Sequence, residues 1–94
     1  MYARLVLFTL SAEGVSKAQS LADDLIPAIN AQPGCAGATF FGDAEAGEHG
    51  LFVLWETKED AEAATSVIGP KLMGGLSGNV QEPPTIRLFE VIKQ

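Results

Sequence analysis

Residues 51–61 read LFVLWETKEDA, and this stretch carries the strongest structural signal in the sequence because it joins an apolar strand to a capped helix. Leu51 to Glu56 is apolar at both parities, which predicts a strand that is covered on both faces. Thr57 offers an N-cap oxygen, and residues 57–60 resemble a capping box with Asp in place of Glu. An apolar stripe at helical spacing then continues to Gly69-Pro70, where we expect the helix to end.

Upstream of this stretch, the pattern predicts a strand, a helix and a second strand. Tyr2 to Leu10 is dense in Leu, Val and Phe, and Ser11 follows it as an N-cap for a helix that ends at Pro33-Gly34. Residues 35–42 are expected to form the second strand. The polar, glycine-rich residues 42–50 are expected to form a hairpin loop, with His49 as a solvated turn residue.

Downstream, residues 71–84 are rich in glycine and proline and predict a surface connection or a mobile flap with one short helical turn. Residues 85–92 form the last expected strand. The order βαββαβ predicts an α+β, ferredoxin-like fold, with a four-stranded antiparallel sheet and two helices on one face. The chain of 94 residues is interpreted as one domain, residues 1–94.

The strands also predict a homodimer. The first, third and last strands carry apolar side chains at both parities, so the sheet face without helices would be apolar as well. A monomer rarely exposes an apolar patch that large, and two copies packed face to face would cover it. We therefore expect two copies of the chain to form a dimeric α/β barrel. A small apolar or aromatic ligand is the second expected partner of the protein.

Composition excludes several classes of function. Six Lys and Arg against twelve Asp and Glu give a net charge of −6, so neither nucleic acid nor a membrane surface is an expected partner. No apolar run approaches the length of a membrane span. The single cysteine, Cys35, excludes an internal disulfide and fits a reducing compartment, so we expect a cytoplasmic protein.

Three residues are candidates for the lining of a ligand pocket. Arg4 and Arg87 each interrupt an apolar strand and could orient a carboxylate or enolate, although either could instead reach water or pair with Glu56 or Glu90. Trp55 could line a pocket or anchor the core or an interface. His49 and Cys35 lack the neighbours that a metal site or a reactive thiolate requires, so we expect no metal, no cofactor and no identifiable catalytic residue.

Three segments resemble the antibiotic-biosynthesis-monooxygenase type of dimeric α/β barrel. They are residues 32–37 (QPGCAG), residues 51–61 and residues 83–91 (PPTIRLFEV). The resemblance implies a dimeric barrel with a pocket between the sheet and its helices or the facing sheet. Some proteins of this type oxidise aromatic substrates with dioxygen, without metal or flavin. The resemblance therefore implies the same kind of oxidation as a candidate activity of this chain.

The sequence departs from the functional residues that this resemblance would carry over. Many members have a histidine nine residues after the tryptophan of the third strand, where this chain has Ala64. At the positions that the haem-degrading branch uses, the chain has Leu7, Ala64 and Gly74, so haem degradation is not expected.

Two functional hypotheses remain open. The resemblance favours a cofactor-independent monooxygenase that acts on a small aromatic or quinone-like substrate in an apolar pocket. The absence of an activated acid, base or nucleophile favours a non-catalytic dimer that binds a small molecule. An isomerase or lyase would need His49 or Tyr2 for proton transfer.

Overall fold

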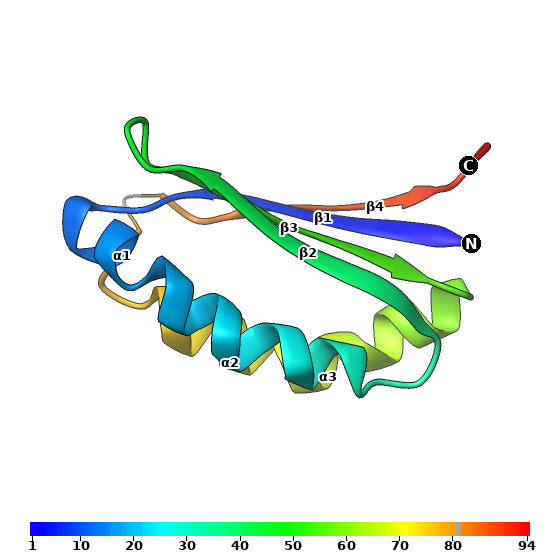
Figure 1. The fold of residues 1–94 in the computed structure, drawn as a ribbon. Helices are drawn as coiled ribbons and strands as arrows, with labels where there is room; N and C mark the ends of the chain where they lie inside the picture. The colour runs from blue at the N-terminus through cyan, green and yellow to red at the C-terminus, as the bar shows by residue number, and fades with distance from the viewer. Residues whose placement is uncertain (81) are drawn as a thin grey trace.

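The computed structural model describes residues 1–80 and 82–94 and has the predicted ferredoxin-like fold. The elements in chain order are β1 (Tyr2–Thr9), α1 (Ala12–Ser16), α2 (Ala18–Asn30), β2 (Cys35–Asp43), β3 (Glu48–Trp55), α3 (Lys58–Leu76) and β4 (Thr85–Glu90). The strands form one antiparallel sheet in the order β2-β3-β1-β4. All three helices lie on the same face of this sheet, and the other face is uncovered (Figure 1).

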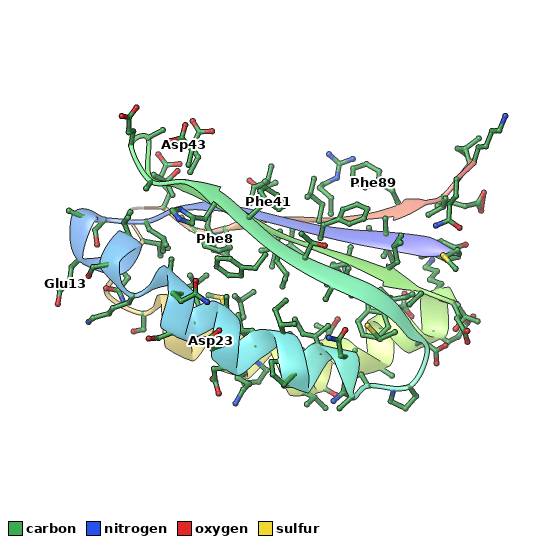
Figure 2. The ribbon with its side chains drawn as sticks, in the orientation of Figure 1. Phe8, Glu13, Asp23, Phe41, Asp43 and Phe89 are labelled. Carbon is green, nitrogen blue, oxygen red and sulfur yellow. The ribbon has the colours of Figure 1, made fainter. Side chains whose placement is uncertain are left out.

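The core lies between the sheet and the two longer helices. Side chains alternate along a strand, so every second residue of β1 and β3 points toward the helices. The buried apolar residues of this layer are Val6, Phe8, Leu10, Leu51, Val53 and Trp55 from the sheet side, and Leu25, Ile29, Ala61, Ala64, Leu72 and Leu76 from the helices. Figure 2 shows Phe8 between the sheet and the helices, whereas Phe41 and Phe89 point away from them.

The first predicted helix is two helices. Ser11 is the expected N-cap of α1, and its Oγ accepts a hydrogen bond from the Gly14 backbone at 3.2 Å. The helix is interrupted at Lys17, which has φ −101° and ψ −1°. Three residues before this break, Gly14 packs tightly against Asn79. A Cβ atom on Gly14 would lie only 2.9 Å from the Cβ atom of Asn79.

The predicted end of the next helix at Gly69-Pro70 was wrong, because α3 continues through Pro70 to Leu76. A proline inside a helix costs about 3 kcal/mol. The extra turns bury Leu72 and Leu76, and burying a leucine side chain contributes about 1.5–3 kcal/mol each, which offsets that cost. The flap predicted for residues 71–84 is therefore helical in its first part. Its residue 81 lies outside the described residues.

The hairpin between β2 and β3 is shorter than predicted. Strand β3 begins at Glu48, so only residues 44–47 connect the strands. The Asp43 Oδ1 atom accepts hydrogen bonds from the backbone N–H groups of Glu45 and Ala46, at 3.1 and 3.3 Å. Gly47 has φ 77°, a left-handed conformation that favours glycine. His49 consequently lies within β3 and is only 7% exposed, so its predicted position in a solvated turn was wrong.

Candidate functional site

A small cavity lies between the sheet and α3, and we call it the α3 cavity. Its volume is about 90 Å³. Its walls are aliphatic side chains of β1, β3 and β4 together with Ala61, Ala64, Thr65 and Gly69 of α3. The spacing of the small residues explains the cavity. Ala61, Ala64 and Gly69 share one side of the helix and leave room that larger side chains would fill.

Trp55 lines the α3 cavity from the end of β3 and is 2% exposed. Its indole Nε1 atom is buried and has no hydrogen-bond partner among the described residues. A buried N–H group without a partner costs about 1–3 kcal/mol. Because this atom is buried from the cavity as well as from solvent, a ligand oxygen could accept its hydrogen bond only after neighbouring side chains move aside.

Arg4 lines the same cavity from β1 and is partly exposed. Its Nη2 atom donates to the Thr65 Oγ atom at 3.4 Å, and the Thr65 hydroxyl in turn donates to the Ala61 carbonyl oxygen. Within the described residues the ion pairs are Lys17–Glu13 and Lys71–Asp24, so neither predicted pairing of an arginine with Glu56 or Glu90 is present. The guanidinium of Arg4 is thus available to an anionic oxygen.

Arg87 lies on the other face of the sheet. It stands directly opposite Leu5, whereas its neighbour Leu88 stands opposite Arg4. Its guanidinium carbon is 4.8 Å from the centroid of the Phe89 ring, a cation–π contact. The structure therefore brings Arg4 and Trp55 together at the α3 cavity and separates Arg87 from them.

The α3 cavity contains no proton-transfer group among the described residues. Its polar side chains are those of Arg4, Trp55 and Thr65. Thr65 was not among the predicted site residues. Thr65 lies among the small residues Ala61, Ala64 and Gly69 on one face of α3, and this spacing is the sequence signal that could have identified it. No group of three or more His, Cys, Asp or Glu residues suited to a metal ion occurs in residues 1–80 and 82–94.

The uncovered sheet face carries a patch of large apolar side chains, which we call the outer-face patch. It comprises Leu7, Phe41, Phe52 and Phe89, which are 38–42% exposed in a single chain. Opposed residues on neighbouring strands share a face, so Leu5 and Leu54 belong to the same surface. No helix of the described part of the chain is long and apolar enough to cross a membrane.

Comparison with solved structures identifies the class of fold. A candidate antibiotic biosynthesis monooxygenase from Nitrosomonas europaea matches with a TM-score of 0.86 and 14% identity, over 99% of this chain and 100% of that one. One from Deinococcus radiodurans matches with a TM-score of 0.85 and 16% identity, over 100% and 95% of the two chains. A variant of SnoaB, a cofactor-independent oxygenase from Streptomyces nogalater, matches with a TM-score of 0.80 and 12% identity, over 99% and 94%.

The chain therefore has the fold of the antibiotic-biosynthesis-monooxygenase type of protein, as the sequence resemblance implied. At these identities the likeness establishes the fold alone. No protein-family model matches the sequence, and no curated protein sequence matches it significantly.

Proposed function

We propose that this protein is a cofactor-independent monooxygenase that oxidises a small aromatic or quinol-like substrate in the α3 cavity. The observation that carries the proposal is the Arg4 guanidinium, which makes no ion pair among the described residues, at an otherwise aliphatic cavity that Trp55 also lines. Both groups would stabilise an anionic substrate oxygen, and a phenolate or enolate is the form that can reduce dioxygen directly. The fold shared with a cofactor-independent oxygenase supports the same reaction class.

The proposed reaction balances without a further reductant. The substrate first loses a proton, and the resulting anion is held by Trp55 and Arg4. The anion transfers electrons to dioxygen and forms a carbon–oxygen bond. One oxygen atom remains in the product as a quinone carbonyl. The other leaves as water, which takes up the proton lost at ionisation and the single hydrogen of the oxidised ring carbon. Since none of the described residues that line the cavity is a general base, the substrate must be acidic enough to ionise with electrostatic help alone.

The size of the cavity favours a substrate with a single ring. An engineered apolar cavity of about 150 Å³ binds benzene, and the α3 cavity holds about 90 Å³. Because the α3 cavity is the smaller of the two, a monocyclic ring with its oxygen near Arg4 would require a small displacement of the walls, and a three-ring substrate a much larger one. We therefore expect quinols and small phenols to be better substrates than polycyclic anthrones.

We further propose that the protein acts as a homodimer in the cytoplasm. The outer-face patch would lie against the same patch of a second copy, because a two-fold arrangement is the commonest way to cover such a face. The free Cys35 is compatible with a reducing compartment.

An alternative function is the binding of a small apolar or aromatic molecule without turnover. The absence of an acid, base or nucleophile from the described lining of the α3 cavity favours it. Both functions predict ligand-dependent thermal stabilisation, and only the first predicts consumption of dioxygen.

The deciding experiment measures oxygen uptake with a panel of quinols, hydroxynaphthalenes and anthrones. Uptake above background that decreases in the Trp55→Phe protein, but not in the control Val67→Ala, would support the monooxygenase. Val67 is a suitable control because it lies on α3 and is 51% exposed. Background uptake together with thermal stabilisation by the same compounds would leave the binding function and reject the enzyme.

A further inference from the structure

The single histidine, His49, is a buried and well-positioned polar side chain that the proposed function does not use. Its Nδ1 atom lies 2.8 Å from the carbonyl oxygen of Gly47. Its ring stacks on Phe8 at a centroid distance of 6.3 Å with 15° between the planes, and it meets Phe40 at 6.3 Å in a tilted contact. The imidazole thus belongs to a cluster of three aromatic rings, in which Phe8 and Phe40 are themselves 6.0 Å apart, and the backbone holds one edge of it.

The β2–β3 hairpin fixes the partner of this histidine. The Gly47 carbonyl oxygen also accepts a hydrogen bond from the Leu10 N–H at 2.8 Å, and the Gly47 N–H donates to the Asp43 carbonyl oxygen at 2.8 Å. The carbonyl can only accept, so Nδ1 of His49 must donate to it. In the neutral imidazole Nε2 then carries the lone pair and is an acceptor.

The acceptor edge of the ring points toward the edge strand β2. A Cβ atom on Gly42, the residue directly opposite His49, would lie 2.2 Å from Cδ2 and 2.6 Å from Nε2. The missing side chain of Gly42 therefore makes the space in which this edge of the ring lies. No hydrogen bond of Nε2 to another described residue is present.

A groove of about 710 Å³ begins at this edge and runs between β2 and the helices α1 and α2, and we call it the α2 groove. His49, Gly42 and Phe40 form part of its sheet side. Aliphatic residues of α1 and α2 form the other wall, with the polar side chains of Gln19 and Asp23 on it. Figure 2 shows Asp23 on α2, below the same end of the sheet as Phe8.

The charge of the groove restricts what could bind. Gln19 donates to the Asp23 Oδ1 atom at 2.9 Å, so the carboxylate is partly held in place. No lysine or arginine occurs among the described residues that line the groove, and the chain has a net charge of −6. An acceptor nitrogen, a carboxylate and an aromatic ring together favour a ligand with N–H or O–H donors and without negative charge.

We propose that the α2 groove is a second ligand site, which takes a small aromatic molecule with a hydrogen-bond donor, uncharged or cationic. The donor binds Nε2 of His49, and the ring packs between Phe40 and the aliphatic wall of α2. This site is separate from the α3 cavity in both lining and ligand charge, since the α3 cavity favours an anion through Arg4. It does not depend on the monooxygenase proposal.

Nuclear magnetic resonance tests the proposal directly, because the chain has one histidine and one tryptophan. The probes are 2-phenylethylamine and phenol, with phenylacetate as the anionic control. We expect the amine to shift the imidazole resonances of His49 in a saturable way while the indole N–H resonance of Trp55 stays in place. Phenol, which the α3 cavity is also proposed to bind, should shift the resonances of both residues. Phenylacetate should shift the His49 resonances only at concentrations at least about tenfold higher.

Two variants separate the contributions to binding. His49→Phe retains an aromatic ring but removes the acceptor, and should weaken amine binding about tenfold, as expected for one lost hydrogen bond. Since this variant lacks the imidazole resonances, calorimetric titration measures the affinity of both proteins. Asp23→Asn, a substitution of an exposed residue that should leave the fold intact, should weaken amine binding and leave phenol binding unchanged. The proposal is overturned if no probe moves the His49 resonances, if phenylacetate binds as well as the amine, or if the probes move only Trp55.

Discussion

Arg4 and Arg87 lie on opposite faces of the sheet, although both interrupt apolar strands that pair directly with each other. The register decides this. Arg87 pairs with Leu5, one residue away from Arg4, and successive side chains of a strand point to opposite faces. Arg4 therefore lines the α3 cavity, and Arg87 stacks on Phe89 at the outer-face patch.

The two arginines should consequently respond differently to the same substitution. Arg4→Met should weaken the binding of a monocyclic phenolate, such as 4-nitrophenolate, by about tenfold or more. A hydrogen bond to a charged group contributes about 1.5–3 kcal/mol. Arg87→Met should leave this affinity unchanged. The measurement is an absorbance titration of the phenolate, and equal losses in both variants would contradict the assignment of Arg4 to the cavity.

The sequence could predict which residues are candidates for the site, but not which face of the sheet each of them points to. The apolar pattern of β1, β3 and β4 runs through both parities, so it indicated two covered faces without saying which face the helices cover. Trp55 was identified as a pocket candidate together with both arginines, but only the pairing register separates Arg87 from the other two. The fold itself was predictable because element order and capping signals are local in sequence.

The outer-face patch should control the oligomeric state. Phe52→Glu places a carboxylate in the middle of the patch and should convert a dimer to a monomer that retains its circular dichroism spectrum. Val67→Glu introduces the same charge at a 51% exposed position of α3 and should leave the dimer intact. Sedimentation velocity distinguishes these outcomes. A wild-type protein that sediments as a monomer at micromolar concentration would refute the dimer.

The core between the sheet and α2 should dominate stability. Leu25 is fully buried, so Leu25→Ala should lower the free energy of unfolding by about 2–5 kcal/mol, which covers lost transfer energy and the cavity left behind. Met73→Ala, at a 49% exposed position, should change it by less than about 0.5 kcal/mol. Urea denaturation followed by circular dichroism measures both. A small effect at Leu25 would mean that α2 is not packed as described.

Two local features were mispredicted because tertiary packing outweighed local signals. The Gly69-Pro70 pair predicts a helix end, but the burial of Leu72 and Leu76 keeps α3 helical beyond it. The glycines close to His49 in the sequence predict a loop at this position. The tight turn from Asp43 to Gly47 instead begins β3 early, and Gly42 provides the space for the imidazole ring.

The dependence of His49 on Gly42 gives a last prediction, with a matched glycine as control. Gly42→Ala should destabilise the protein by about 1–3 kcal/mol, because its Cβ would overlap the imidazole and displace it from the Gly47 carbonyl. Gly74→Ala in α3 meets no atom within 4 Å and should stabilise by up to about 1 kcal/mol, through helix propensity. In a His49→Ala background the Gly42→Ala substitution should cost much less, since the overlapping ring is gone. Urea denaturation of the four proteins of this cycle measures the coupling, and a cost at Gly42 that is independent of His49 would show that the ring does not lie over this glycine.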